Sequence, residues 1–170
     1  MRQLTIAILV ALTLAACADP NAYAVPDKQQ WTDIGTAVRD YYALRNQLTA
    51  GLTVEDFWRT YPDLGYEHDL RSGINLEVML WKWSHDPQLV RLNYRTDIES
   101  YQPVRVFVRA NEALAFVHGI ETWEHRTGGG PTKGEFRTVL TLKLADGAWT
   151  VVRTDEQKMG ERPPTDPPMR

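Results

Sequence analysis

The stretch from residue 134 to residue 157 constrains the fold of this chain more than any other. It reads GEFRTVLTLKLADGAWTVVRTDEQ, with apolar residues at alternate positions on both sides of Asp146-Gly147. Asp-Gly favours a type I′ turn because both positions tolerate a positive φ, so the pattern predicts an antiparallel hairpin with a two-residue loop. An uninterrupted register then predicts these facing pairs: Ala145–Ala148, Leu144–Trp149, Leu142–Val151, Leu140–Arg153 and Thr138–Asp155.

One face of this hairpin changes character along its length. It is apolar near the turn and polar at the open end, and its members in that order are Leu144, Trp149, Leu142, Val151, Leu140, Arg153, Thr138 and Asp155. An apolar sheet face has to be covered by another layer of structure. We therefore expect the rest of the chain to pack on this face.

The segment that precedes the sheet has helical patterns. Asp27-x-x-Gln30 is typical of a capping box, and Gly51 stands where a helix C-terminus favours glycine, which together predict a first helix at 28–50. Its apolar residues at helical spacing are Trp31, Ile34, Val38, Tyr41 and Leu48. Thr53 predicts the start of a shorter second helix that ends before Pro62, and residues 74–83 fit a third helix.

From residue 89 onward the apolar period changes to two, which predicts strands. The predicted strands lie around 92–98 and at 104–109 and 113–123, with a bulge or bend at Pro103. The strand at 113–123 is apolar on both faces over part of its length, which predicts a central place in the sheet. Residues 126–133 predict a loop, and the proline-rich residues 158–170 predict a disordered tail. The result is an α+β fold with helices on one face of an antiparallel sheet.

Composition narrows the classes of function. The chain has 170 residues, 43% of them hydrophobic, which suits one globular domain, and its net charge of −3 argues against a nucleic-acid partner. It has a single cysteine, so the sequence predicts no disulfide and no catalytic thiol. The four histidines have no metal-ligand spacing, and we expect neither a metal nor another cofactor.

The N-terminus carries the most specific motif. A basic start and an apolar run at 4–14, too short to span a membrane, end in Leu14-Ala15-Ala16-Cys17. This resembles the lipobox of bacterial lipoproteins, which implies a signal peptide at 1–16, a lipid on Cys17 and a tether at 17–27. It also implies export to the bacterial cell envelope and a lipid anchor in a membrane. The alternative is an ordinary secretory signal cut near Ala16.

The order of elements and the strand ending ADGAWTVVRTDE resemble the SnoaL-like/ketosteroid-isomerase-like superfamily, which includes nuclear transport factor 2. The resemblance covers residues 28–157. It implies a strongly curved antiparallel sheet that wraps the first helix into a cone-shaped, cystatin-like superfold with a pocket, and a convex sheet face that can form a homodimer. Other two-layer α+β folds of the cystatin or lipocalin-like kind remain alternatives.

The candidate pocket residues follow from the hairpin register and from this resemblance. They are Tyr42, Glu121, Trp123, Leu140, Val151, Arg153 and Asp155. A carboxylate or imidazole in a dry cavity could act as a general base, and Asp155, Glu121 and His118 are the candidates. No set of catalytic residues assembles from the sequence.

We therefore expect a lipid-anchored envelope protein with a non-catalytic domain that binds a protein or a small apolar ligand with a polar group. The alternatives are a small isomerase, cyclase or hydratase-like enzyme with a general acid/base in the cone, and a structural homodimeric module of the envelope.

Overall fold

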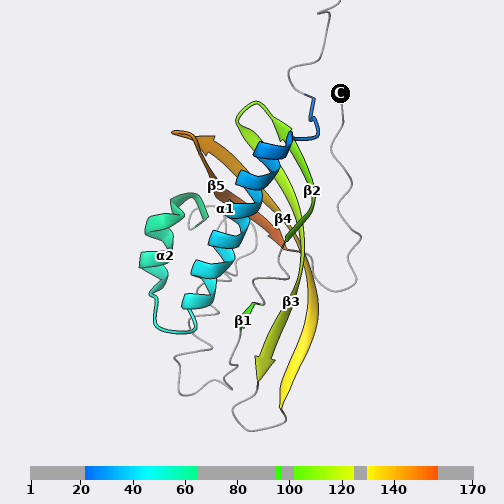
Figure 1. Ribbon diagram of the computed structural model, residues 1–170. Coiled ribbons are helices and arrows are strands. Elements are labelled where there is room, and N and C mark those ends of the chain that lie inside the picture. The colour runs from blue at the N-terminus through cyan, green and yellow to red at the C-terminus, as the bar shows by residue number, and fades with distance from the viewer. Residues whose placement is uncertain (1–21, 65–94, 97–101, 125–129, 157–170) are drawn as a thin grey trace, which may run out of the picture.

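The computed structural model describes residues 22–64, 95–96, 102–124 and 130–156. Within them the fold is α+β, with helix α1 packed across a five-stranded antiparallel sheet (Figure 1), which confirms the predicted class. The helices are α1 (Lys28–Gln47) and α2 (Val54–Thr60). The strands are β1 (Arg95–Thr96), β2 (Gln102–Arg109), β3 (Glu112–Glu124), β4 (Pro131–Ala145) and β5 (Ala148–Glu156).

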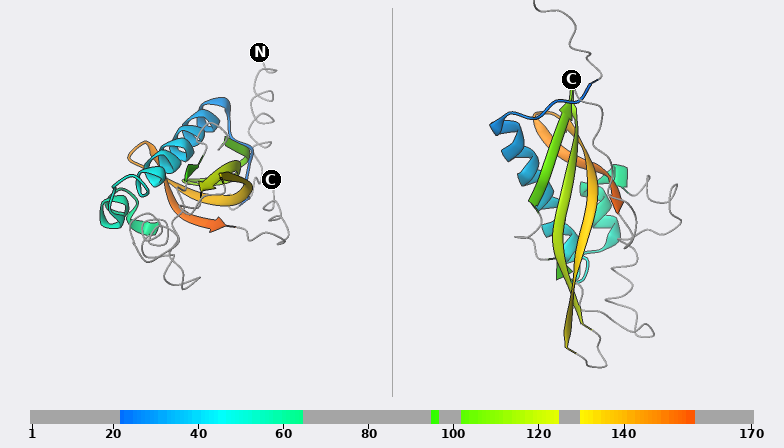
Figure 2. Two further views of the ribbon diagram at one scale, coloured as in Figure 1. Left: turned by 90° about the horizontal axis from the view of Figure 1, so that it is seen from below. Right: turned by 90° about the vertical axis from the view of Figure 1, so that its right-hand side faces the viewer.

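Strand β3 is central, as its apolar character on both faces predicts. The sheet order is β1-β3-β4-β5. Strand β2 pairs with the same edge of β3 as β1 does: β2 pairs with residues 112–118 of β3, and β1 pairs with residues 121 and 122. The two helices lie on one side of the sheet (Figure 2), so we call that side the helix face and the opposite side the outer face. The expected bulge near Pro103 is confirmed, because the register of β2 shifts between Pro103 and Arg105.

The start of α1 confirms the capping box. The Asp27 carboxylate accepts from the Gln30 backbone N–H at 2.8 Å, and the Gln30 side-chain oxygen accepts from the Asp27 N–H at 3.1 Å. The helix ends at Gln47 rather than at 50, because the N–H groups of Ala50 and Leu52 both turn back to the Gln47 carbonyl. The prediction that Trp31 belongs to the buried stripe is wrong: α1 begins at the end of the sheet (Figure 1), and Trp31 is 37% exposed.

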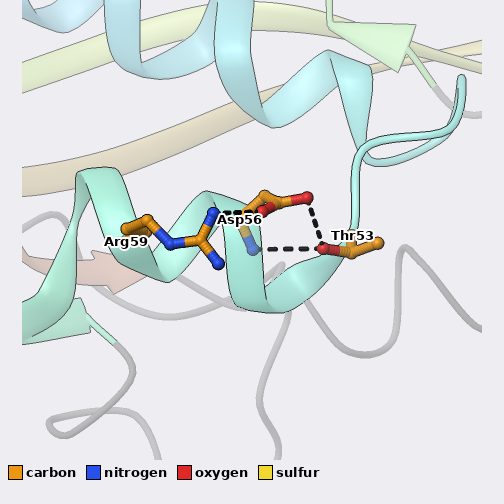
Figure 3. A network of polar contacts seen from close by, with 3 residues as sticks. All are labelled: Thr53, Asp56 and Arg59. Atoms are coloured by element: carbon orange, nitrogen blue, oxygen red, sulfur yellow. Dashed lines mark hydrogen bonds and ion pairs between the residues drawn. The ribbon is translucent and has the colours of Figure 1, made fainter.

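Helix α2 begins at the predicted cap (Figure 3). The Thr53 hydroxyl oxygen accepts from the Asp56 N–H at 3.1 Å and donates to the Asp56 carboxylate at 2.8 Å. Arg59, one turn later, lies 2.5 Å from the other oxygen of that carboxylate. The hydrogen bonds from Thr53 and then Arg59 lower the pKa of Asp56 below its ordinary value. The charge of Asp56 also suits the positive end of the helix dipole.

The main core lies between the helices and the helix face. Small residues of β3, Ala113 and Ala115, pair with the larger Leu142 and Leu140 of β4, so the sheet presents an interlocking surface to the helices. The buried members from the helical segment are Ile34, Val38, Tyr41, Tyr42, Leu48, Val54, Phe57, Tyr61 and Leu64. At about 25 cal/mol per Å² of apolar surface, this burial is the main force that holds the two layers together.

A second, smaller core lies on the outer face. It consists of Tyr23, Phe107, Phe116 and Val139, with the rings of Phe107 and Phe116 in an edge-to-face contact at 5.7 Å. Three of these side chains come from neighbouring strands of the sheet. Tyr23 comes from the segment that precedes α1.

That segment, residues 22–24, is packed on the sheet, and we call it the strap. Ala24 exchanges two backbone hydrogen bonds with Val108 at the edge of β2, at 2.9 and 2.8 Å. Tyr23 is buried, its hydroxyl donates to the Glu112 carboxylate, and the Arg109 guanidinium lies 4.6 Å from its ring centroid. The prediction of a tether through residue 27 is therefore wrong from Ala22 onward, because this edge of β2 offers the strap backbone partners.

Two further predictions need comment. The loop expected at 126–133 is wrong at its end, because β4 begins at Pro131 and pairs with Glu124. Several predictions fall outside the described residues: the helix at 74–83, the signal peptide, Cys17, the tail at 158–170 and most of the strand around 92–98.

Tyr23→Phe tests the packing of the strap by titration. Burial, and then the hydrogen bond to Glu112, raise the pKa of Tyr23 from 10.0 to about 12. The folded protein thus holds this proton more tightly than the unfolded chain, so the resulting stability is complete below pH 10 and is lost as the pH rises towards 12. We expect the absorbance titration curve of the wild type, after subtraction of the curve of Tyr23→Phe, to show one phenol that ionises with a pKa of about 12. A difference curve centred near 10 would show that Tyr23 is not packed as described.

Candidate functional site

The sequence predicted a binding site on one face of the hairpin formed by β4 and β5. The pairing register of the two strands determines which residues lie on that face. Near the turn the prediction is confirmed: Leu144 faces Trp149 and Leu142 faces Val151. The register then shifts, because Thr141 pairs with Arg153 and Val152 is left as an extra residue in β5.

This bulge moves the charged pair to the other side of the sheet. Beyond it Leu140 pairs with Thr154 rather than Arg153, and Thr138 pairs with Glu156 rather than Asp155. A shift of one residue exchanges the two faces of a strand. The prediction that Leu140, Val151, Arg153 and Asp155 share a face is therefore wrong: Thr154 takes the position on the helix face, and the two charged residues occupy outer-face positions.

Three of the predicted pocket residues lie together on the helix side. Tyr42, Leu140 and Val151 are each 0% exposed and belong to the main core. The ring of Tyr42 packs edge-to-face against Tyr41, with 4.9 Å between centroids. All three belong to one cluster of buried residues, so in the described fold their side chains form a packed core.

Two other predicted residues are placed by their backbones alone. Glu121 pairs with Thr96 of β1 and with Gly134 of β4, and Trp123 pairs with Thr132. Both lie in the part of β3 that continues past the end of β2, where β3 and β4 form a long ribbon (Figure 1). Their side chains lie outside the described residues, so their role stays a prediction.

Arg153 and Asp155 form an ion pair at the surface. The Arg153 guanidinium lies 2.9 Å from the Asp155 carboxylate, and the side chains are 34% and 43% exposed. An exposed pair of this kind contributes at most about 1 kcal/mol to stability. His118 is also on the outer face, 3.4 Å from Glu135 and 40% exposed. Asp155 and His118 are therefore partly exposed on the outer face, and neither lies in the dry cavity that the sequence predicted for a general base.

Arg45 is a buried residue that the sequence prediction missed. It is 1% exposed on the buried side of α1, and its guanidinium lies 5.5 Å from the centroid of the Tyr42 ring. The signal was present in the spacing, because residue 45 continues the alternation of four and three residues that links Ile34, Val38 and Tyr41. A search of the helix for apolar residues at core spacing does not find this position, because arginine is charged.

The outer face carries an excess of positive charge although the chain has a net charge of −3. By register position, the basic residues of this face are Arg95, Arg105, Arg109, Lys133, Arg137, Lys143 and Arg153, and the acidic ones are Glu112, Glu124, Glu135 and Asp155. Arg105 is exposed, and its guanidinium lies 4.5 Å above the Phe116 ring. Arg109 lies 2.8 Å from Glu112. The face is thus a small apolar core under a layer that is mainly basic.

Two findings concern other classes of site. In the part of the chain that the structure describes, no group of three acidic, histidine or cysteine side chains could hold a metal ion. None of the described helices is long and apolar enough to cross a membrane.

Comparisons with known proteins add little to this geometry. No family model matches the chain. No curated protein matches it. Among solved structures it is similar to the crystal structure of the intermembrane space region of the chloroplast protein ARC6, with a TM-score of 0.43 and 12% identity, over 74% of this chain and 95% of that chain. We draw no argument about fold or function from a likeness at that level.

Substituting aspartate at two threonines of β5 tests which face each lies on. Thr154 is 9% exposed on the helix face, so Thr154→Asp would bury a charge in the core and lower the free energy of unfolding by several kcal/mol. Thr150 faces Lys143 on the outer face, so Thr150→Asp should change it by no more than about 0.5 kcal/mol. Urea denaturation measures both. Equal, small changes in the free energy of unfolding for both variants would indicate an uninterrupted register and contradict the bulge.

Proposed function

We propose that this chain is a lipid-anchored protein of the bacterial cell envelope whose α+β domain binds an acidic protein partner through the outer face of its sheet. The observation that carries the proposal is the excess of basic side chains on the outer face of an otherwise acidic chain. The binding is non-catalytic and needs no cofactor.

The geometry favours a protein over a small molecule. Small-molecule sites are concave and enclose most of their ligand. On the helix face the candidate pocket residues Tyr42, Leu140 and Val151 are core residues with no exposed surface. The outer face spans β2 to β5 and suits the roughly 800 Å² per partner that a protein interface buries.

The chemistry of the outer face indicates an acidic partner. Arginines dominate its basic side chains, and arginine and aromatic residues are enriched where proteins meet. Arg105 is held above Phe116, so its position is partly fixed before binding. A basic face on an acidic chain attracts a negatively charged surface and orients it during approach.

Two finer features belong to this proposal. The helices followed by an antiparallel sheet, with α1 crossing the sheet, support a SnoaL-like domain over residues 28–157 with the curved, cone-shaped, cystatin-like form of that superfamily. The lipobox supports a signal peptide at 1–16, a lipid on Cys17 and anchoring of the exported protein to a membrane.

A homodimer is the second candidate function, because the outer face corresponds to the convex sheet face that the resemblance predicts for self-association. Charge weighs against it, since two copies of a basic face repel unless acidic residues are interleaved. The enzyme alternative keeps Glu121 as its candidate general base, whereas Asp155 and His118 lie on the outer face in contact with charged partners.

Cys17→Ala tests the anchor. Without the thiol no lipid can be attached, so we expect the variant to leave the membrane fraction and to appear with the exported soluble proteins or as uncleaved precursor. Asn21→Ser, close to the same segment, is the control and should stay with the membranes. A processed Cys17→Ala protein that still sediments with membranes would refute lipid anchoring.

Charge reversal tests the outer face. The triple variant Arg105→Glu, Arg137→Glu and Lys143→Glu changes three exposed residues of this face. The matched control reverses exposed Lys28, Arg39 and Arg59 in the helices, again two arginines and one lysine. Crosslinking of the full-length protein in membranes should yield a partner that the outer-face variant loses and the control keeps.

The result would contradict the proposal if both triple variants retain the crosslinked partner, or if wild type gives none. A crosslinked species that contains only this chain would assign the face to a homodimer instead.

A further inference from the structure

The strap attaches the chain to the edge of the sheet before α1 begins. Ala24 forms two backbone hydrogen bonds with Val108, and Tyr23 is buried on the outer face, where its ring lies 4.6 Å from the Arg109 guanidinium. Within the described residues, packed structure therefore begins at residue 22, several residues before α1. Figure 1 shows the strap, the start of α1 and the turn between β2 and β3 at the same end of the molecule.

This start limits how far the domain can lie from a lipid on Cys17. Only residues 18–21 separate Cys17 from Ala22, and five Cα-to-Cα steps of at most ~3.5 Å span about 18 Å. The headgroup layer takes up roughly 5–8 Å of each leaflet. A lipid whose glycerol lies at the base of that layer thus holds the strap end of the domain at or within about 10 Å of the headgroups.

Exposed apolar side chains are concentrated at this same end. The large hydrophobic residues that stand out as exposed in the described chain are Val25, Trp31 and Val104, at 69%, 37% and 59%. Two of these three follow the strap within a few residues. Tryptophan is enriched where membranes meet water because its ring is apolar and its N–H is polar.

We infer that Val25 and Trp31 form a membrane-contact patch that inserts into the headgroup layer of the bilayer holding the lipid. This inference rests on the lipid anchor of the proposed function. The inference adds an orientation to the proposed function: the strap end of the domain lies on the membrane, and the outer face of the sheet stays open for a partner. The lipid surface is the occupant, because the short link from Cys17 brings the patch to that surface in every copy of the anchored protein.

A spin label at Val25 tests this orientation. The full-length, lipidated Val25→Cys protein would be labelled and placed in vesicles of phosphatidylethanolamine and phosphatidylglycerol. Oxygen concentrates in the bilayer and a nickel chelate stays in water, so collisions with the two reagents report where the label lies. We expect the label at Val25 to collide more with oxygen than with the chelate. The matched control is Thr60→Cys, exposed at the end of α2, whose label should favour the chelate.

The outcomes separate the two proposals. If the protein sediments with the vesicles but both labels favour the chelate, the patch does not contact lipid and the inference is wrong, while the anchor stands. If the Val25 label is accessible to the chelate in pure vesicles and shielded only in native membranes, the patch belongs to a protein and the inference is again wrong. If the protein does not sediment with vesicles at all, the anchor itself fails and the inference fails with it.

Discussion

The bulge at Val152 determines what this sheet presents to each side. Leu142 pairs with Val151 and Thr141 pairs with Arg153, which leaves Val152 as the extra residue of β5. The strand has no glycine or proline at this point. The consequence is large because strand faces alternate with a period of two. Without the bulge, the charged pair Arg153–Asp155 would project into the helix layer. With it, Thr154 lies on the core side and the ion pair stays partly exposed at the surface.

The two faces of the sheet then have different roles. On the helix face, small residues of β3 stand beside larger ones of β4, and α1 and α2 supply a continuous set of fully buried side chains. On the outer face, a smaller aromatic core lies beneath Arg105 and Arg109, and the strap extends that core beyond the sheet edge through Tyr23. The stability of the domain depends mainly on the first face. Its interactions with other molecules are proposed for the second face and for the strap end.

Local chemistry made a large part of the fold predictable from the sequence. Asp27, Thr53 and Asp146-Gly147 act through hydrogen bonds and dihedral preferences within a few residues, so the two helix starts and the turn could be located without knowledge of the tertiary structure. The central place of β3 followed from its apolar character on both faces. The bulge could not be located, because the run Thr-Val-Val-Arg-Thr at 150–154 alternates acceptably in either register. Packing against α1 selects between them.

The strap and Arg45 were missed for different reasons. The strap lies in a proline-containing, mixed segment whose only apolar features are alanines, Tyr23 and Val25, and its partner Val108 is far away in sequence. Arg45 has the spacing of a core residue, and only its charge led to its omission from the apolar stripe. Of the candidate site, Tyr42, Leu140 and Val151 lie in the main core, and a charged rim beside them depended on a register that the structure does not have.

The most direct test of this account is the register of β4 and β5 in solution, measured by nuclear Overhauser effects between backbone protons of the two strands. The bulge predicts cross-strand contacts that pair Leu140 with Thr154 and Thr141 with Arg153. Contacts that pair Leu140 with Arg153 and Thr138 with Asp155 would show an uninterrupted hairpin. They would return the charged pair to the helix face and contradict the closed core.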